Sequence, residues 1–496
     1  MKFARPSKKS VLLSELCHQF KISNNDLKAN ITGITHNTES VEQGDLFVAL
    51  SGEKTHGAKF ISQAVANGAV AVLTDLEGQQ LIGEIEIPVL VAENPRHILG
   101  DVSSFVFGNP SSHLKVLGIT GTNGKTTAAW LLKAGLEKSG LPTSLLGTVG
   151  NSIAGLNFPS ARTTPEAPEL QALLALALEK GSKAVSMEVS SHSLTLERIN
   201  GTKFSSVGFT NLSQDHLDFH KNMENYFEAK AQLFTNKFSE KAVITTTDNW
   251  GKKLAAQTQI PFMSLGGDVT NDWRVQDITA AFGHVYFEVI DQRKKAHKVT
   301  LSFAGAFNAY NAALVIAMAQ QIGVDVKEFI SGIKETQIPG RMQPIAIPGA
   351  ALGIIDYAHT PEAIENVLSA LKKQTNGKLI VVIGAGGNRD AEKRPFMGSS
   401  GEKFADKLFI TDDNPRDENP AQIRKEIISG IKNKSQITEV GDRQSAIKQA
   451  VSSSNPDDTI AILGKGHETT QEVSGEIFDF DDSKVLLDAL QEKFGK

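Results

Sequence analysis

A glycine-rich stretch in the first third of the chain has the residue types that bind a nucleoside triphosphate. Residues 118–127 read GITGTNGKTT. Glycines let backbone amides turn toward an anion, Lys125 supplies a mobile positive charge for the β- and γ-phosphates, and Thr126 can place a hydroxyl on Mg²⁺. Five residues rather than four separate Gly118 from Gly124, so the strict phosphate-loop pattern is not met. The alternative is a glycine-rich turn before an ordinary helix, and we favour phosphate binding because a strand-like run precedes the loop and helical spacing follows it.

A lysine in an unexpected position is the second candidate for chemistry. The helical pattern of residues 223–234 places Lys230 on the apolar stripe with Phe227 and Phe234. A buried lysine tends to lose its proton, because burial disfavours the ammonium form. Its stem could instead extend along the apolar surface and bring the ammonium to solvent. In the sharper hypothesis the neutral amine reacts with CO₂, and the resulting carbamate has two oxygens suited to a hard divalent cation.

Glu188 and His216 could complete a cation site with this lysine. Glu188 lies near the end of the strand-like run 184–189, and His216 follows the similar run 206–212. Ligands gather at the carboxyl ends of strands in parallel sheets. Mg²⁺ takes few protein ligands and keeps waters and phosphates. Each residue alone is more simply explained by an ordinary polar role, so the hypothesis depends on the three together.

The elements that must position these residues alternate along the chain. Strand-like runs at 44–50, 69–74, 115–120, 352–356, 379–383, 407–411 and 459–463 are separated by stretches of helical spacing. This order predicts an α/β fold with parallel sheets and helices on both faces. A length of 496 residues suggests about three domains at roughly 150 residues each. Turn formers at 107–113 and a break near 338–340 divide the chain into residues 1–110, 111–338 and 339–496.

Composition excludes several classes of protein. The formal net charge is −5, from 51 Lys and Arg against 56 Asp and Glu, which disfavours a nucleic-acid partner. The longest apolar runs, such as 69–73 and 379–385, are far shorter than the roughly 18–20 residues of a membrane span. The apolar run 11–13 is too short for a secretory signal. Because Cys17 is the single cysteine, no internal disulfide is possible, and we expect a cytoplasmic protein without membrane insertion.

Taken together, the motifs resemble those of the Mur ligase family, which builds the cell-wall peptide of bacteria. The resemblance runs over nearly the whole chain and is specific because many motifs occur in the right order. They are TGTNGKTT (120–127), EVSSH (188–192), TNLSQDHLD (210–218), EAKAQLF (228–234), FNAYN (307–311), PGRM (339–342), DYAHTP (356–361), GGNRDAEKRP (386–395), DNPRDENP (413–420) and GKGHE (464–468).

The resemblance implies three domains with separate tasks. An N-terminal domain would hold a UDP-sugar, a central P-loop-type domain with a parallel sheet would be the ATPase, and a C-terminal Rossmann-like domain would receive an amino acid. It implies ATP, two Mg²⁺ ions and a CO₂-derived carbamate on Lys230 as cofactors, and we expect a monomer. It also implies that the catalytic residues are Lys125, Glu188, His216 and Lys230, and that the metal ligands are Thr126, Glu188, His216 and carbamylated Lys230.

The remaining site residues also follow from the resemblance. It implies that ATP contacts Gly121, Thr122, Asn123, Gly124, Lys125, Thr126, Thr127, Asn308, Asn311, Arg341 and Asp356. It implies that a UDP-MurNAc-dipeptide contacts Thr38, Thr163, Thr164, Ser190 and Arg198. The uridine segment departs from the family's usual D-S-R, because it reads Asn37-Thr38-Glu39 and lacks the cation. Leu196 and Gln214 also depart from residues that are common in the family at those positions.

Selection of the amino acid is the most chemically readable feature. Diaminopimelate carries one more carboxylate than lysine, and a guanidinium can grip a carboxylate through two parallel hydrogen bonds. Arg416 in DNPR supplies that group and matches the diaminopimelate-adding branch of the family, whereas lysine-adding members lack it. A surface arginine in a turn is the alternative explanation. The implied contacts to diaminopimelate are Arg394, Asp413, Asn414, Pro415, Arg416, Gly464 and Glu468.

The predicted reaction is an ATP-dependent ligation in peptidoglycan precursor synthesis. ATP would phosphorylate the side-chain carboxylate of D-Glu in UDP-MurNAc-L-Ala-D-Glu, and the amine of meso-diaminopimelate would attack the acyl phosphate. Positioning contributes most of the catalysis in such reactions. The alternatives are an L-lysine-adding relative, a folylpolyglutamate synthetase-like ligase and a regulatory ATP-binding module.

Overall fold

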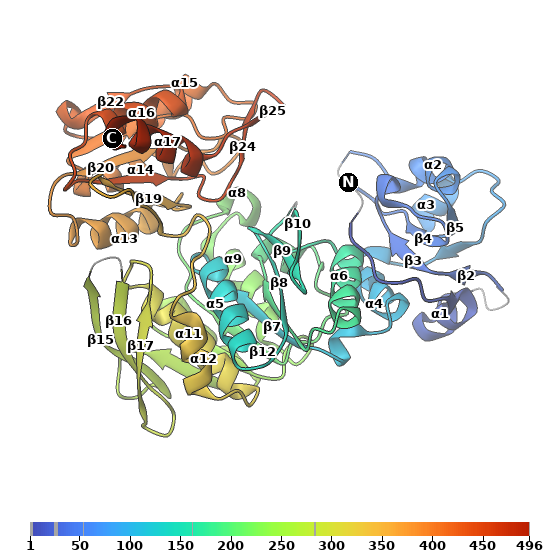
Figure 1. Cartoon of the computed structure of the whole chain (residues 1–496). Coiled ribbons are helices and arrows are strands. Elements are labelled where there is room, and N and C mark those ends of the chain that lie inside the picture. Colours follow the sequence, from blue (N-terminus) through green and yellow to red (C-terminus); the bar gives the residue numbers. More distant parts are fainter. Residues whose placement is uncertain (1–2, 24–27, 53, 161, 282–283, 496) are drawn as a thin grey trace.

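The computed structural model describes residues 3–23, 28–52, 54–160, 162–281 and 284–495. Three main sheets follow one another along the chain, in the blue, the cyan to yellow and the orange to red parts of Figure 1. The first is a parallel four-stranded sheet in the order β3-β4-β5-β6. Its strands are β3 (Gly33–Thr35), β4 (Asp45–Val48), β5 (Ala69–Thr74) and β6 (Val89–Val91), with α1 (Leu13–Phe20), α2 (Ile61–Ala66), α3 (Leu76–Leu81), α4 (Pro95–Val106) and the small pair β1 (Val11–Leu12) and β2 (Asn30–Ile31) around it.

The central sheet has eleven strands in the order β10-β9-β8-β11-β7-β12-β13-β14-β15-β16-β17. Strands β8 to β15 in this order pair in parallel, and antiparallel hairpins extend both edges. The strands are β7 (Lys115–Thr120), β8 (Thr143–Gly147), β9 (Gly150–Ile153), β10 (Leu156–Phe158), β11 (Ala184–Glu188), β12 (Ser206–Phe209), β13 (Ala242–Thr245), β14 (Phe262–Gly266), β15 (Trp273–Ala281), β16 (His284–Ile290) and β17 (Ala296–Leu301).

Helices cover this sheet and carry the expected phosphate-loop connection. They are α5 (Lys125–Lys138), α6 (Ala167–Glu179), α7 (Ser191–Thr195), α8 (Leu217–His220), α9 (Met223–Ala231), α10 (Asn249–Gln257), α11 (Asn308–Gln321) and α12 (Val326–Ile333). The strand, glycine-rich turn and helix at 115–138 are confirmed. The predicted helix 223–234 is α9 followed by a 3₁₀ turn over Gln232–Phe234, so its last turn tightens rather than continuing as α-helix.

The third sheet has the order β18-β19-β23-β20-β21-β22, in which only the β18–β19 pair is antiparallel. Its elements are β18 (Gln343–Ile345), β19 (Leu352–Asp356), β20 (Leu379–Ile383), β21 (Lys407–Ile410), β22 (Ile437–Glu439), β23 (Thr459–Leu463), α13 (Pro361–Lys372), α14 (Arg394–Phe404), α15 (Pro420–Ser429), α16 (Arg443–Ser452) and α17 (Asp482–Phe494), with the hairpin β24 (Thr470–Val473) and β25 (Glu476–Asp479) beside it.

The apolar runs of β20 and β23 explain why helices lie on both faces of this sheet. Along β20, Val381 and Ile383 join the core that includes α13 and α14, whereas Ile380 and Val382 join the core of α16 and α17. Side chains alternate between the two faces of a strand, so an uninterrupted apolar run requires burial on both. The four strands predicted in this part of the chain are confirmed. Within the described ranges, no helix is long and apolar enough to cross a membrane.

Candidate active site

A large cleft of about 1150 Å³ lies where the central and C-terminal parts of the chain meet. Its walls come from the carboxyl ends of parallel strands in both sheets, including the loops after β7, β11, β12, β19 and β20. This is the edge where parallel sheets hold ligands. The predicted residues that line it are Thr122, Asn123, Gly124, Lys125, Thr126, Thr127, Thr163, Glu188, Ser190, Arg198, His216, Lys230, Asn308, Asn311, Arg341, Asp356, Asp413, Asn414, Arg416, Gly464 and Glu468.

The glycine-rich loop is held tightly against its neighbours. A Cβ atom at Gly121 would lie 1.9 Å from the Thr210 hydroxyl, and one at Gly124 would lie 2.4 Å from the Asn311 amide oxygen. Both glycines also have left-handed φ angles, of 150° and 88°. The backbone amide of Asn123 donates to the side-chain oxygen of Asn211 at 3.0 Å. The loop therefore has a defined shape, with Gly124 as the N-cap of α5.

Lys125 folds back over this loop. Its Nζ donates to the carbonyl oxygens of Gly121 and Thr122, at 2.9 and 2.8 Å. Burial lowers the pKa of Lys125, and the carboxylates of Glu188 and Asp215 act in the opposite direction. A lysine in a glycine-rich loop at the N-terminus of a helix is the arrangement that binds the phosphates of a nucleotide.

Oxygen ligands for a hard cation lie directly beside this lysine. The Thr126 hydroxyl donates to Glu188 at 2.9 Å and accepts from the Arg341 guanidinium at 3.1 Å. Glu188 is buried, and it also accepts from the backbone amide of Thr148 at 2.8 Å. A hydroxyl and a carboxylate suit Mg²⁺. Within the described residues no group of three or more His, Cys, Asp and Glu side chains could hold a metal alone, so an ion here would need ligands from phosphate and water.

Lys230 is buried, as its place on the apolar stripe predicts. It is 1% exposed, and its Nζ donates to the carbonyl of Gly121 at 2.9 Å and lies 4.6 Å from the centre of the Tyr226 ring. Burial, with the nearby charge of Lys125, lowers the pKa of Lys230 well below its ordinary value. The structure thus excludes the alternative in which its ammonium reaches bulk solvent.

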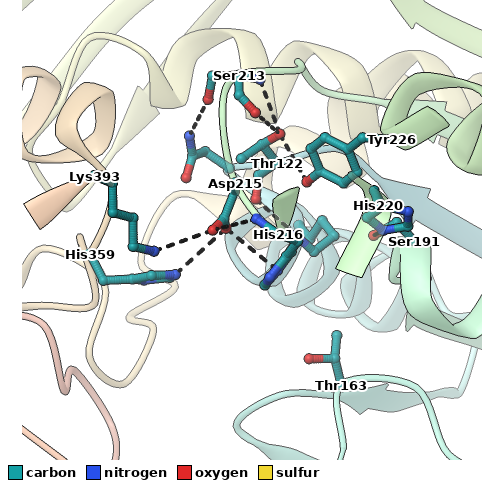
Figure 2. A network of polar contacts seen from close by, with 12 residues as sticks. Thr122, Thr163, Ser191, Ser213, Asp215, His216, His220, Tyr226, His359 and Lys393 are labelled. Carbon is teal, nitrogen blue, oxygen red and sulfur yellow. Dashed lines mark hydrogen bonds and ion pairs between the residues drawn. The ribbon is translucent and has the colours of Figure 1, made fainter. Parts of the chain in front are cut away.

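His216 belongs to a polar network that joins the central and C-terminal parts of the chain (Figure 2). Asp215 lies 3.4 Å from Nε2 of His216, 3.3 Å from Nζ of Lys393 and 3.8 Å from Nε2 of His359. Burial alone would raise the pKa of Asp215, but these three groups outweigh burial and hold that pKa well below its usual range. Burial also lowers the pKa of His216, which favours the neutral imidazole that can bind a metal.

The far wall of the nucleotide end comes from α11 and the start of the C-terminal part. The Asn311 amide donates to the side-chain oxygen of Asn308 at 3.0 Å, and both side chains are buried. Asp356 accepts from the backbone amides of Met342 and Ala358, at 2.7 and 2.8 Å. Burial raises the pKa of Asp356, while Arg341 and these two bonds lower it.

Arg416 lines the cleft from the C-terminal part of the chain, beside the loop that follows β20. Its Nη1 donates to the carbonyl of Gly387 at 2.7 Å, and its Nε lies 3.2 Å from the Glu472 carboxylate. The side chain is 22% exposed, and the residue has a left-handed φ of 51°. A surface arginine in a turn does not fit this placement, because the guanidinium lines the same cleft as Lys125.

Asn414 and Glu468 form the floor beside Arg416. The Asn414 amide donates to Glu468 at 2.8 Å, and the fully buried Lys465 donates to Asn414 at 3.0 Å and to Glu468 at 3.2 Å. Gly464 approaches Asp413 so closely that a Cβ atom would lie 2.6 Å from its carboxylate. Pro415 does not line the cleft, but its carbonyl packs against Gly387 and shapes the same turn.

Arg394, a predicted contact of the amino acid, is held by other side chains of its own chain. Arg394 is 1% exposed and lies outside the cleft lining. Its Nη1 donates to Glu418 and Glu426, at 2.8 and 2.7 Å, and its Nη2 donates to Glu418 and to the carbonyl of Gly386. The guanidinium of Arg394 therefore forms ion pairs with two carboxylates of its own chain. The second arginine that lines this end of the cleft is Arg389.

The residues predicted for a UDP-linked substrate are only partly brought together. The Thr164 hydroxyl accepts from the backbone amide of Ser190 at 3.0 Å, and Thr163 accepts from the Thr148 hydroxyl at 3.0 Å. Arg198 lies 2.8 Å from Glu166. Thr38 lies in the N-terminal part, in a 3₁₀ turn over Thr38–Ser40, and does not line the cleft. Gly121 and Thr164 likewise do not line the cleft.

Sequence reasoning missed several residues that line the cleft. They are Tyr357, His359, Arg389 and Lys393. A usable signal was present, because Tyr357 and His359 follow β19 and Arg389 follows β20, at the carboxyl ends where the strand rule places ligands.

Comparisons with known proteins agree along the chain. Residues 30–105 match the model of the Mur ligase family, catalytic domain; residues 119–319 match the Mur ligase middle domain; and residues 340–466 match the Mur ligase, glutamate ligase domain. The chain is 39% identical to UDP-N-acetylmuramoyl-L-alanyl-D-glutamate–2,6-diaminopimelate ligase of Streptomyces coelicolor, over 97% of each chain. It is 41% identical to the ligase of the same name from Corynebacterium glutamicum, over 93% of this chain and 92% of that one. A solved structure of a ligase of this name has a TM-score of 0.68 and 30% identity, covering 98% of this chain and 99% of the other.

Proposed function

This chain belongs to the Mur ligase family of ATP-dependent ligases, and we propose that it adds meso-diaminopimelate to UDP-MurNAc-L-Ala-D-Glu in peptidoglycan precursor synthesis. The observation that carries this proposal is the position of Arg416, whose guanidinium lines the same cleft as the phosphate-binding Lys125. Relatives that match nearly the full length of the chain carry the name of this activity.

Both chemical steps take place at the same side-chain carboxyl group of D-Glu, which must lie between the bound nucleotide and the incoming amino acid. The γ-phosphorus of ATP forms a bond to an oxygen of the D-Glu side-chain carboxylate, and its bond to the β–γ bridging oxygen breaks, releasing ADP. The amine of diaminopimelate then bonds to the acyl carbon, the bond from that carbon to the phosphate oxygen breaks, and the nitrogen loses a proton. Lys125 and Arg341 are placed to offset charge on the transferring group, since Arg341 reaches Thr126.

The side chains in the cleft include ligands that suit two Mg²⁺ ions. Thr126 and Glu188 would hold one ion beside the phosphates, and His216 with a carbamate on Lys230 would hold the second. Bound Mg²⁺ neutralises phosphate charge and orients the transferring group. The carbamate proposal is supported by the burial of Lys230 and by its lowered pKa, because only the neutral amine adds to CO₂. Addition forms an N–C bond and releases one proton.

Arg416 would receive the distal carboxylate of diaminopimelate, and Asp413, Asn414, Gly464 and Glu468 would surround its amino acid group. Arg389 replaces Arg394 in this proposal, because it lines the cleft. Residues 1–110 would hold the UDP part of the acceptor, 111–338 would bind ATP, and 339–496 would receive the amino acid. With ATP and a UDP-linked acceptor as substrates, we place the reaction in the cytoplasm and expect the monomer to suffice.

The direct test is phosphate release from ATP, measured with UDP-MurNAc-L-Ala-D-Glu and either meso-diaminopimelate or L-lysine. We expect release that requires both the acceptor and diaminopimelate, with lysine a poor substitute. Equal or better turnover with lysine would assign the lysine-adding activity instead. Release that is independent of both substrates would favour a regulatory ATPase, and activity with a folate acceptor would favour a folylpolyglutamate synthetase-like ligase.

A further inference from the structure

One tyrosine contacts residues of both the proposed nucleotide site and the proposed amino-acid site, and neither the proposed chemistry nor the predicted site includes it. Tyr357 directly follows Asp356 at the carboxyl end of β19 and lines the cleft. On one side, the Arg341 guanidinium carbon lies 4.4 Å from the centre of its ring. On the other side, its hydroxyl donates to Glu468 at 3.4 Å.

The ring of Tyr357 contacts Arg341, which lies beside the proposed nucleotide site. Arg341 stacks on Tyr357 and from there donates to the Thr126 hydroxyl at 3.1 Å. Thr126 in turn donates to Glu188. The only other hydrogen bond of the Arg341 side chain within the described ranges is from Nη1 to the carbonyl of Gly340, at 3.2 Å. A flexible arginine so sparsely bonded depends on the aromatic face for its direction, because stacking restrains the guanidinium plane.

The hydroxyl of Tyr357 contacts Glu468, which lies in the proposed amino-acid site. Glu468 accepts from Asn414 and Lys465 through Oε2, whereas Oε1 has the Tyr357 hydroxyl as its hydrogen-bond donor among the described residues. The tyrosine thus fixes the second oxygen of the carboxylate and leaves that oxygen beside the cleft. Burial and the charge of Glu468 raise the pKa of Tyr357, so the phenol keeps its proton and acts as the donor.

The ring itself is tightly held. The rings of His359 and His467 pack against it, with centres 4.8 and 5.4 Å from that of Tyr357. Gly466 packs against it so closely that a Cβ atom there would lie 2.8 Å from the Tyr357 Cβ atom. The ring is therefore a rigid support for both neighbours.

We propose that Tyr357 is a positioning residue with two separable roles: its ring directs Arg341 toward the nucleotide, and its hydroxyl orients Glu468 for the incoming amino acid. This inference rests on the proposed function, because it assigns Glu468 to the amino acid and Arg341 to the nucleotide. The roles are separable because phenylalanine keeps the ring and removes only the hydroxyl.

The test compares Tyr357→Phe and Tyr357→Leu by steady-state phosphate release, varying meso-diaminopimelate and ATP separately. For Tyr357→Phe we expect the KM for diaminopimelate to rise about 3- to 10-fold, the loss of one hydrogen bond, with the KM for ATP within about twofold of wild type. For Tyr357→Leu we expect the same effect and, in addition, a fall of about 5- to 30-fold in kcat/KM for ATP, from the lost cation–π contact.

Tyr286→Phe is the matched control, because Tyr286 is an exposed tyrosine of β16 outside the cleft. A Tyr357→Phe enzyme that keeps the wild-type KM for diaminopimelate, or that loses affinity for both substrates equally, would overturn the inference. If Tyr357→Leu does not fold, Tyr357→Met, which fills more of the same space without an aromatic face, tests the role of the ring, and Tyr357→Phe still tests the role of the hydroxyl. Failure of the wild-type enzyme to use diaminopimelate would instead reject the proposed function, so the two failures are distinguishable.

Discussion

Replacing Arg416 should remove the preference for diaminopimelate and leave the ATP chemistry intact. The guanidinium is anchored by the Gly387 carbonyl at 2.7 Å and by Glu472 at 3.2 Å, and it is 22% exposed. These anchors hold its remaining donors toward the cleft. A distal carboxylate would accept from them, whereas the side chain of lysine ends in an ammonium group that cannot accept a hydrogen bond.

The size of the effect follows from these contacts. A hydrogen bond to a charged group contributes about 1.5–3 kcal/mol, and the partial exposure of Arg416 favours the lower half of that range. In Arg416→Ala the carboxylates of Glu468 and Glu472 would also repel the substrate's carboxylate. A loss of roughly 2–4 kcal/mol corresponds to a fall of about 30- to 700-fold in kcat/KM for diaminopimelate, since 1.4 kcal/mol is tenfold. Arg416→Lys keeps the charge without the fork and should lose about tenfold.

The assay is phosphate release with diaminopimelate and with L-lysine, for wild type, both variants and Arg293→Ala. Arg293 is an exposed arginine between β16 and β17 and serves as the control. With L-lysine we expect Arg416→Ala to stay within about threefold of wild type, because that substrate has no distal carboxylate for Arg416 to bind. If both amino acids lose activity by the same factor, Arg416 only maintains the local structure and the reasoning is refuted.

Three further outcomes test other parts of the site. Lys230→Ala should lower turnover about 10²- to 10³-fold, with partial recovery on adding a short carboxylic acid; wild-type turnover without that addition would remove the carbamate from the mechanism. Arg394→Ala should lower the thermal midpoint with little change in the KM for diaminopimelate, whereas Arg389→Ala should raise that KM with little change in the midpoint, and the reverse pattern would restore the original assignment. Glu166→Gln should destabilise the protein by about 1–3 kcal/mol at neutral pH, because it leaves the surrounding arginines without their counter-ion. Burial raises the pKa of Glu166, but Arg198, His36 and Arg96 outweigh burial and lower it, so this stability is present above the ordinary glutamate pKa and is lost as pH falls through the folded value. The difference between variant and wild type, followed by thermal unfolding, should therefore shrink toward acid, and a constant difference would contradict this account.

Local patterns predicted the placement of Lys230 correctly, and the reason is physical. Its neighbours Phe227 and Phe234 are within one turn of helix, so the chain alone fixes which face it shares. Both aromatic residues are buried with it in the structure. The strand, loop and helix around Lys125 were predictable because their apolar run, glycines and helical spacing are local patterns, although distant residues such as Thr210 and Asn311 then pack against the loop.

The surroundings of Arg394 could not be predicted from the sequence, because the contacts that determine them are distant along the chain. Arg394 opens α14, and its guanidinium is captured by Glu418 and by Glu426 on α15. Arg389 and Arg394 are five residues apart in one motif, and no periodicity or spacing separates them. Only the packing of α15 against α14 determines which guanidinium meets carboxylates of its own chain and which is left for a ligand.

Contacts between the central and C-terminal parts of the chain, the two lobes that enclose the cleft, were also beyond what the sequence could predict. Arg341 donates to Thr126 across 215 positions of sequence, and Lys393 lies 3.3 Å from Asp215 across 178. The strand rule predicts that both loops face a cleft, because they leave the carboxyl ends of parallel strands. The strand rule does not predict that these loops of the central and C-terminal sheets line a single shared cleft, since that depends on how the C-terminal sheet packs against the central one. Arg341 of the C-terminal part contacts Thr126 of the phosphate loop, so under the proposed function closure of the two parts would also assemble the site of phosphoryl transfer. An enzyme built this way should hydrolyse little ATP while its lobes are apart, because Arg341 is then absent from the nucleotide.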